Sequence, residues 1–384
     1  MDIFMLLSKN KAQTTHSASS KHSIQPSGHN TWKKLALSTM LFISLPVILT
    51  ACKNSDAEAI NPDIQNSKYL TDQQPRLGII AAFGQEADLL LEQTQNKKDY
   101  RINGRKFTTG LLAGTPIVIT ISGISMTNAA MTTQMLTDHF QLKGIVFSGI
   151  AGSLNPALHV GDVVVAKRWI APDEVYYANT SDLPSACGEA GDISCLGLKL
   201  DTNIPPFQQR FLRQTNVINQ QNYDQVALTT KIDNAEVPIA YGEMKTDFPV
   251  NTEMLDFAQT TKDNTQNQLE AICQNNNQCY NPKIIMGERG VSGGAFLANS
   301  QFRDYLHSNL AGDVVDMETT AVAQVAYSND IPFIAFRSVS DLAGADHDPN
   351  VAAFFGSGVA QRNAAKVTIG FIQEWQKANK LTVK

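Results

Sequence analysis

Two carboxylates and one arginine in the last quarter of the chain have the types and spacing of an acid–base site. Glu318 follows the β-branched pair Val314-Val315 and precedes apolar residues at helical spacing, so we expect it in a helix's first turn. Arg337 and Asp341 follow the apolar run 331–336, which is typical of a buried parallel strand. Open α/β sheets bind ligands at the carboxyl ends of their strands. These groups could therefore bind and protonate a small polar ligand at one sheet edge.

A third carboxylate occupies a similar position near the start of the domain. Residues 76–83 predict the first strand, and Gly84-Gln85-Glu86 leads into a predicted helix over 87–93. Glu86 therefore also follows a strand's carboxyl end. Taken singly, each of these acids is more often an ordinary helix-start or loop residue. It is their combination that resembles a site.

The remaining patterns predict the elements that must position these groups. Strands are expected at 106–112 and 116–121 as an antiparallel pair, and at 144–147, 161–167 and 283–287; helices are expected after residue 125 and over 252–260, 297–306 and 356–377. Residues 148–153, Ser-Gly-Ile-Ala-Gly-Ser, predict a glycine-rich turn. In such a turn, backbone N–H groups can approach an anion or a ribose closely.

The segments VVDMETTAVA (314–323) and FRSVSDLAG (336–344) resemble the signature of the nucleoside phosphorylase/nucleosidase family, and the resemblance extends over most of residues 76–376. That family includes purine nucleoside phosphorylases, methylthioadenosine/S-adenosylhomocysteine nucleosidases and plant bark-storage proteins. The resemblance implies an α/β fold of three layers, α/β/α, with a central mixed, partly barrel-like β-sheet flanked by helices. It also implies an enzyme that cleaves the N-glycosidic bond of a small-molecule nucleoside, needs no metal or organic cofactor, and forms a homo-oligomer, most simply a dimer.

The same resemblance assigns roles to individual residues. Asp341 would be the general acid for the leaving base, Glu86 would orient and deprotonate water, and Arg337 would fix Glu86 and the water. Glu318 would bind the ribose 2′- and 3′-hydroxyls. The other substrate-binding residues that the resemblance implies are Met317 at the sugar, Phe296 stacked on the base, Ser340, Gly149 and Gly293.

Two departures from the family pattern bear on the nucleophile. Phosphorylases of this family carry an arginine where this chain has Phe147 and a serine where it has Ile150. Neither side chain here can hold a phosphate dianion by the strong, charge-assisted contacts. We therefore expect hydrolysis of a purine nucleoside or a methylthioadenosine-like compound. A phosphorylase is the alternative, and a non-catalytic nucleoside-binding or storage-type protein is the second alternative.

The overall composition fits one large globular domain. The chain has 384 residues, of which 43% are hydrophobic and 17% charged, and its net charge is −5. No repeat is visible, and no long basic run indicates nucleic acid as a partner.

The N-terminal segment has the pattern of a bacterial lipoprotein signal. Lys33-Lys34 precede an uncharged apolar run over 35–51, which is short for a bilayer span of ~20 residues. The run ends in Leu49-Thr50-Ala51-Cys52, which resembles a lipobox. We expect residues 1–51 to be a signal peptide, Cys52 to be lipidated, and 52–75 to be a flexible polar tether. The domain over 76–384 would then face the periplasm or the cell surface, attached to the membrane by lipid only. An uncleaved N-terminal anchor is the alternative.

Four further cysteines lie in a long insertion at about 169–282, where the family pattern fades. Cys187 and Cys195 are eight residues apart, and Cys273 and Cys279 are six apart. Both spacings suit small disulfide loops in an oxidising compartment, and local pairing is preferred among the three connectivities. A zinc site is the competing interpretation. The resemblance to bark-storage proteins at the 273–279 loop favours a disulfide there.

Overall fold

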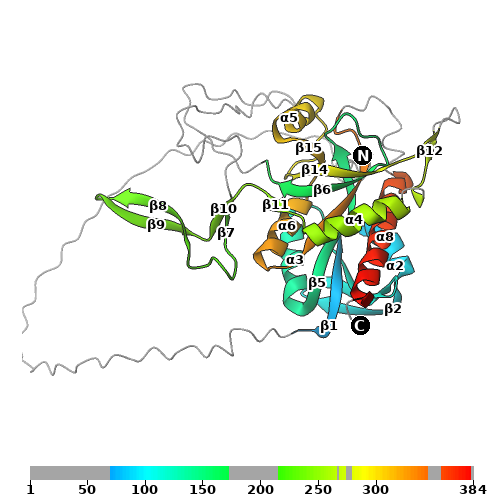
Figure 1. The fold of residues 1–384 in the computed structure, drawn as a ribbon, viewed down its shortest axis with the longest axis horizontal. Coiled ribbons are helices and arrows are strands. Elements are labelled where there is room, and N and C mark those ends of the chain that lie inside the picture. The colour runs from blue at the N-terminus through cyan, green and yellow to red at the C-terminus, as the bar shows by residue number, and fades with distance from the viewer. Residues whose placement is uncertain (1–69, 173–214, 266–267, 274–278, 345–355, 382–384) are drawn as a thin grey trace, which may run out of the picture. The chain divides into compact units, whose positions relative to one another are not determined.

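The computed structural model describes residues 70–172, 215–265, 268–273, 279–344 and 356–381 (Figure 1). A ten-stranded mixed sheet forms its centre. Its strands are β1 (Asp72–Ala81), β2 (Gln95–Ile102), β3 (Arg105–Leu112), β4 (Thr115–Ile121), β5 (Phe140–Ser153), β6 (Val163–Ile170), β11 (Phe248–Pro249), β14 (Ile284–Ser292), β15 (Gly312–Asp316) and β16 (Phe333–Asp341). The strand order is β11-β6-β14-β15-β5-β1-β4-β3-β2, and β16 pairs with both β5 and β6.

The double pairing of β16 closes part of the sheet into a barrel. β16 runs parallel to β5 and antiparallel to β6, so β5, β15, β14, β6 and β16 form a closed ring of five strands. The last ten residues of β5 are buried, as expected for a strand covered on both faces. The fold class expected from the sequence, a mixed and partly barrel-like sheet between helices, is therefore confirmed.

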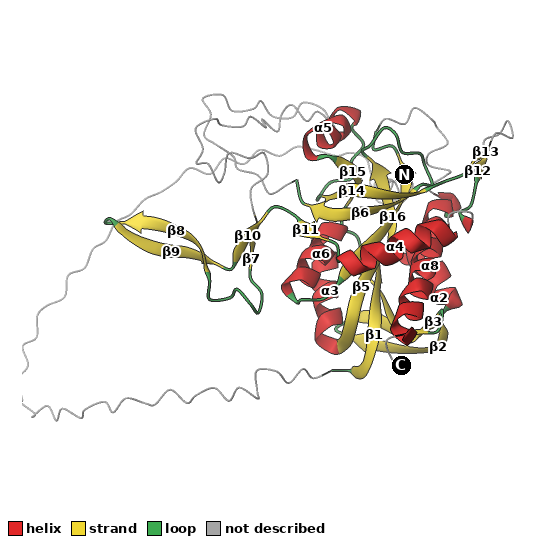
Figure 2. Ribbon diagram, viewed as in Figure 1, coloured by secondary structure: helices red, strands yellow, loops and turns green. Residues whose placement is uncertain are grey.

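Helices cover the sheet (Figure 2). They are α2 (Gly84–Gln93), α3 (Met126–His139), α4 (Thr252–Thr265), α5 (Ser300–Leu310), α6 (Thr319–Ser328) and α8 (Val359–Leu381). The helix α8 packs on β5 and β16 and also contacts α2 and α4, while α3 and α6 pack against each other. The predicted helices near 126, 252, 300 and 359 are thus present.

Three differences from the predicted elements bear on the site. The strand β16 does not end at residue 336 but continues through Arg337 to Asp341, because it pairs with two neighbours along this length. Residues 148–153 form no turn; they are the last part of β5, which must continue to pair with β15 and β16. β1 begins at Asp72, within the segment predicted as tether, where Arg76 binds the Asp72 carboxylate at 2.8 Å.

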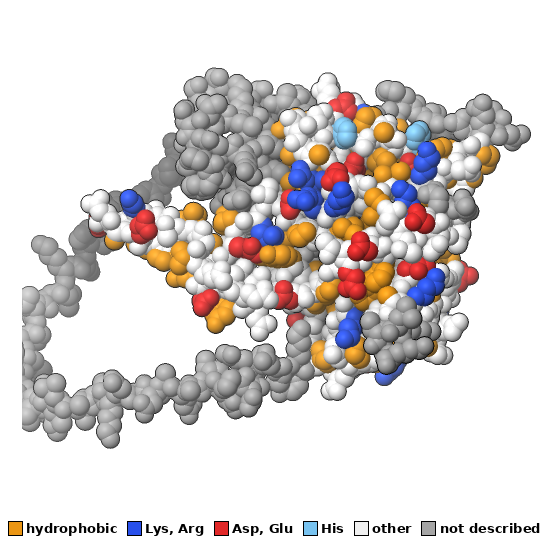
Figure 3. Space-filling view, in the orientation of Figure 1, with side chains coloured by type: hydrophobic (Ala, Val, Ile, Leu, Met, Phe, Trp, Pro, Cys, Tyr) orange, Lys and Arg blue, Asp and Glu red, His pale blue; other side chains and the backbone are white. Residues whose placement is uncertain are grey.

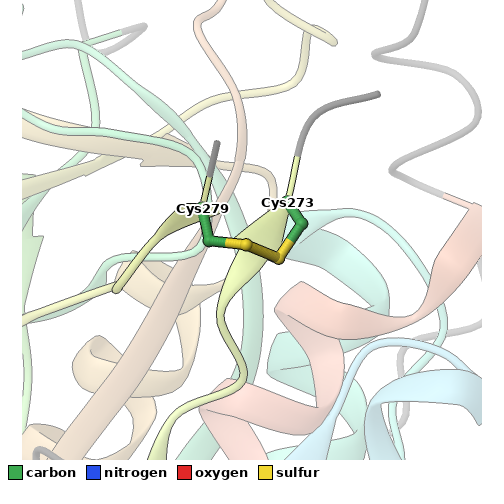
Figure 4. Close-up of a disulfide and its surroundings, with 2 residues drawn as sticks. All are labelled: Cys273 and Cys279. Atoms are coloured by element: carbon green, nitrogen blue, oxygen red, sulfur yellow. A yellow bond between two sulfur atoms is a disulfide. The ribbon is translucent and has the colours of Figure 1, made fainter. Parts of the chain in front are cut away.

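The insertion contains three small two-stranded sheets among its described residues. They pair β7 (Thr215–Val217) with β10 (Glu243–Lys245), β8 (Val226–Ile232) with β9 (Ala235–Tyr241), and β12 (Ile272–Cys273) with β13 (Cys279–Tyr280). A disulfide joins Cys273 to Cys279 (Figure 4), which confirms the predicted local pairing for these two. Cys187, Cys195 and the N-terminal segment with Cys52 lie outside the described residues. Within the described part of the chain, no helix has the length and apolar character needed to span a membrane.

Candidate active site

A small cavity of about 110 Å³ lies where β1, β5, β15 and β16 end or begin their loops. Its lining consists of Ala82, Phe83, Glu86, Ile124, Ile150, Ala151, Gly152, Ala295, Phe296, Leu297, Val315, Asp316, Met317, Glu318, Ser340 and Asp341. Six residues predicted for the site, from four separate segments of the chain, therefore meet around one space. Four of the lining residues are acids, and the described lining contains no Lys, Arg or His.

Glu86 is held rigidly at the cavity by backbone donors. It lies in the first turn of α2, after β1, and is 1% exposed. Its two carboxylate oxygens accept hydrogen bonds from the Ala82 N–H at 2.6 Å and the Ile150 N–H at 2.8 Å. Burial raises the pKa of Glu86 to about 7, although the nearby Arg337 guanidinium and these two N–H groups act in the opposite direction. A carboxylate with this pKa can accept or release a proton near neutral pH.

Glu318 lies directly before α6, at its N-cap position, rather than inside the first helical turn. One carboxylate oxygen accepts a hydrogen bond from the Ser125 N–H at 2.9 Å, and the other faces Arg337 at 3.2 Å. Ser125, the donor, has a positive φ of 102°. Burial raises the pKa of Glu318, and the adjacent Asp316 carboxylate raises it further.

Arg337 lies beneath the cavity and does not line it. Its side chain is fully buried in β16, and its Nε lies 2.6 Å from the Asp316 carboxylate and 2.9 Å from the Thr319 hydroxyl. Its Nη1 is 3.7 Å from Glu86 and makes no hydrogen bond to the described residues. Burial alone would lower the pKa of Arg337, but the carboxylates of Asp316, Glu86 and Glu318 outweigh burial and raise it. Arg337 is thus a buried cation that holds acids in place.

Asp316 is the residue that sequence reasoning missed. Besides Arg337, its carboxylate binds the Ser292 hydroxyl at 2.5 Å and the backbone N–H groups of Glu318 and Thr319 at 3.1 Å. Ser292 in turn accepts a hydrogen bond from the Thr320 N–H at 2.8 Å. Asp316 therefore fixes the turn between β15 and α6 on which Glu318 lies. Asp316 lies two residues before Glu318, at the end of a predicted strand, and this position could have indicated its role in the site.

Asp341 lies at the far end of β16. The Ser340 hydroxyl donates to one of its carboxylate oxygens at 2.7 Å, and the Ala343 N–H donates to the other at 2.9 Å. Phe296 borders the same cavity with 67% of its surface exposed, and Met317 lines it beside Glu318. An exposed aromatic ring beside an acid suits a flat, polar heterocycle.

The two predicted glycines lie near the site without lining the cavity. Gly149 of β5 pairs with Arg337 of β16, and the Gly293 N–H donates to the Asp316 carbonyl at 3.1 Å. The phosphate-site departures also have structural roles here. Phe147 is fully buried, and the Arg337 guanidinium lies 4.1 Å from the centre of its ring. The backbone N–H of Ile150 donates a hydrogen bond to the Glu86 carboxylate.

Gly149→Ala is expected to disrupt the site. A Cβ atom at this position would overlap Arg337 Nη1 and Glu86 Oε1, and would lie 2.7 Å from the Glu86 carboxyl carbon. Both side chains are buried and cannot move away freely, so the overlap should cost ~1–3 kcal/mol of folding free energy. Gly84→Ala is the matched control, since its Cβ would meet nothing within 4 Å. Denaturant unfolding of both variants checks this, and equal stability of the two would contradict the packing described.

The cavity brings four carboxylates and an exposed aromatic ring around one small space, an arrangement suited to acid–base chemistry on a small ligand. Residues 76–373 match the model of the Phosphorylase superfamily, and the chain belongs to that superfamily.

Among curated proteins, the chain is 27% identical over 281 residues to a 5′-methylthioadenosine/S-adenosylhomocysteine nucleosidase of Mycobacterium bovis, covering 73% of this chain and 91% of the relative. It is 25% identical over 279 residues to the nucleosidase of the same name from Staphylococcus aureus, covering 72% of this chain and 91% of the relative. Solved structures share the fold. That of the Streptococcus pneumoniae nucleosidase has a TM-score of 0.51 at 21% identity, covering 78% of this chain and 99% of the other. The structure of futalosine hydrolase from Helicobacter pylori has a TM-score of 0.51 at 19% identity, covering 78% of this chain and 98% of the other.

Proposed function

We propose that this protein is a nucleosidase that hydrolyses the N-glycosidic bond of a purine nucleoside or a methylthioadenosine-like compound. The products are the free base and ribose or a ribose derivative. The observation that carries this proposal is a cavity with four carboxylates and no cationic side chain in its described lining. Cleavage of this bond develops positive charge on the sugar, which carboxylates stabilise, and negative charge on the base, which needs a proton. The nucleosidase relatives support the same reaction.

The positions of the acids suggest a division of roles. Asp341 and the exposed Phe296 ring line the same cavity, and Asp341 would protonate the leaving base. Glu318 would accept hydrogen bonds from the ribose hydroxyls, with Met317 against the sugar. Glu86 would take a proton from the attacking water. Arg337, which does not reach the cavity, would position Glu86 and Glu318 rather than touch water.

The nucleophile distinguishes this proposal from a phosphorylase. A phosphate dianion in this cavity would meet carboxylates, and the Arg337 guanidinium beneath the cavity is already surrounded by three of them. The test incubates the purified protein with inosine, adenosine and methylthioadenosine, with and without phosphate, and follows free base and sugar. We expect base and free ribose or methylthioribose at a rate that phosphate does not change. A requirement for phosphate, with a sugar 1-phosphate as product, would establish the phosphorylase instead. No release of base from any of the three nucleosides would favour a binding protein.

The pKa of Glu86 predicts the pH dependence of the reaction. A general base must be deprotonated, so kcat/KM should fall about tenfold per pH unit as the pH drops below 7. Any fall at higher pH would report deprotonation of the general acid and not of Glu86. The measurement is a kcat/KM profile from pH 5 to 9 on the wild type and on Glu86→Gln. The variant should be slow and should lack this acidic limb. An unchanged limb in the variant, or a wild-type limb near pH 4.5, would assign the titration to another group.

We also propose that the chain is exported and lipidated at Cys52, so that the domain lies in the periplasm or at the cell surface. The support is the basic, apolar and Leu-Thr-Ala-Cys pattern of residues 33–52. We also propose a second disulfide, Cys187–Cys195, which an oxidising compartment would permit. A homodimer is proposed as well, from the family resemblance. Labelling cells with a fatty-acid analogue should mark the wild type but not Cys52→Ala. Equal labelling of both, or nucleosidase activity that appears only after the inner membrane is opened, would refute export by this route.

A further inference from the structure

A second cavity lies at the opposite end of the sheet from the active site. It has a volume of about 560 Å³ and is formed near the starts of β1 and β5, at the turn from β3 to β4, and along the C-terminal part of α8. The active-site cavity is instead lined by residues that follow β1 and by the last part of β5. Because β1 and β5 are parallel, the two cavities lie at opposite ends of the same strands.

The two cavities differ in charge. The second cavity contains Arg76 and Lys143, and its described lining has no Asp or Glu, whereas four acids line the active-site cavity. Figure 3 shows Lys and Arg side chains beside hydrophobic ones near the lower edge of the domain, where α8 ends. Arg76 already binds the Asp72 carboxylate at 2.8 Å and the Ile117 carbonyl at 3.2 Å. Lys143 is exposed and forms no ion pair with the described residues, so its charge is left for a ligand with one anionic group.

An aromatic ring and two amides line the second cavity together with Lys143. Trp375 of α8 is partly exposed, and its ring packs edge-on against Phe257, with the ring centres 5.8 Å apart. Gln376 and Asn379 follow on the same helix and line the cavity as well. A partly exposed tryptophan can stack on a planar aromatic group, and a side-chain amide can donate a hydrogen bond to a carboxylate.

One buried polar group in the lining has no partner. Thr115, at the start of β4, is 7% exposed, and its hydroxyl makes no hydrogen bond to the described residues. Most buried hydroxyls in proteins are hydrogen-bonded, so an unpaired one requires an explanation. A polar ligand in the adjoining cavity offers such a partner.

We propose that the second cavity binds a planar aromatic carboxylate. The ring would stack on Trp375 and the carboxylate would face Lys143, with the Gln376 amide as a further donor. The volume lies within the range of about 300–1,000 Å³ that is usual for pockets of small organic ligands. An anion of this kind would be repelled by the acids of the active-site cavity, so the two cavities select different ligands. This binding does not depend on the proposed hydrolysis.

Titration calorimetry of the full-length chain in mild detergent tests the proposal, with 2-naphthoate as the probe. We expect a dissociation constant of about 1 mM or lower, from the usual affinity per atom of small ligands. Two further probes separate the charge from the ring. Naphthalene-2-methanol has the same rings without the charge, and cyclohexanecarboxylate has the charge without an aromatic ring. Each should bind about tenfold more weakly or worse.

Two variants locate the binding site. Lys143→Gln should weaken the binding of 2-naphthoate about tenfold and leave that of naphthalene-2-methanol unchanged, since it removes only the charge. Trp375→Phe should weaken both about threefold or more, because it reduces the stacking surface. Lys231→Gln, on the exposed strand β8, removes the same charge outside the cavity and should have no effect.

The outcomes that would overturn the proposal are distinct. No heat of binding for 2-naphthoate at ten times the expected dissociation constant would exclude the site. Equal affinity for 2-naphthoate and naphthalene-2-methanol would exclude an anion as its ligand. Wild-type affinity in Lys143→Gln would place the binding elsewhere on the protein. Lys143 is exposed, so the unfolding midpoint of this variant should equal that of the wild type, and a loss of affinity then belongs to the cavity.

Discussion

Asp341→Asn is expected to lower kcat by ~10²–10⁴-fold while leaving KM within a few-fold of wild type. Asparagine has nearly the shape of aspartate, and its carbonyl oxygen can still accept the hydrogen bond from the Ala343 N–H. It has no acidic proton to give to a leaving base. The lost interaction belongs to the transition state and not to substrate binding, so the change should appear in kcat. Steady-state kinetics with methylthioadenosine or inosine measures both constants.

The matched control is Asp138→Asn, on the exposed end of α3, where the carboxylate only meets a neighbouring glutamine. It should behave as wild type. A near-normal kcat for Asp341→Asn would remove Asp341 from the role of general acid. A large rise in KM with kcat unchanged would make it a substrate-binding residue instead.

Arg337→Met should be the most destabilising single substitution at the site, lowering the free energy of unfolding by ~3–5 kcal/mol. Methionine fills much of the same space but leaves Asp316, Glu86 and Glu318 buried together without their cation. The loss should depend on pH in a definite direction. Without arginine the pKa values of Glu86 and Glu318 rise further above their unfolded values, so protonation stabilises the folded variant at low pH, and this stabilisation is lost as pH rises. The deficit relative to wild type should therefore be larger at pH 8 than at pH 5.

Denaturant unfolding at both pH values checks this prediction. Arg101→Met, on the exposed strand β2, is the control and should change stability by no more than about 0.5 kcal/mol. A deficit for Arg337→Met that is the same at pH 5 and pH 8 would point to packing alone, and the picture of a cation surrounded by acids would fail. Arg337→Lys keeps the charge but not the planar fork, so its loss should be intermediate.

The sequence predicted the acidic residues of the site better than it predicted the strands that position them. The sequence placed three acids, Glu86, Glu318 and Asp341, at the carboxyl ends of strands, because each follows an apolar run. A local pattern of this kind depends only on neighbours in the chain. The strand β2 was missed because it lies at the sheet edge and is almost wholly polar, QNKKDYRI, so it carries no alternation to read. The extension of β5 through residues 148–153 was read as a turn, because glycines there signal flexibility locally. In the fold, Gly149 permits the close approach of Arg337 and Glu86, and Gly152 that of Asp341 and Ala343.

The burial of Arg337 and the role of Asp316 could not be obtained from local patterns. Both depend on β16 pairing with two strands that are distant in the sequence, which brings one guanidinium against acids from α2 and from the β15–α6 turn. An arginine after an apolar run looks like the end of a strand, and only closure of the ring shows that the strand continues. Long-range pairing also placed Phe147 against that guanidinium.

Closure of the five-stranded ring has a consequence for how the chain reaches its active form. β16 joins the ring by pairing Phe333 with Ile145 and Ser338 with Val163, contacts between segments well over a hundred residues apart. Bringing such distant segments together carries an entropic cost and slows folding. Because the acids come from α2, the turn before α6, and β16, they can surround one ligand only after this long-range pairing has formed. A partly folded chain therefore has no rudimentary hydrolytic capacity, and turnover begins when the barrel is complete.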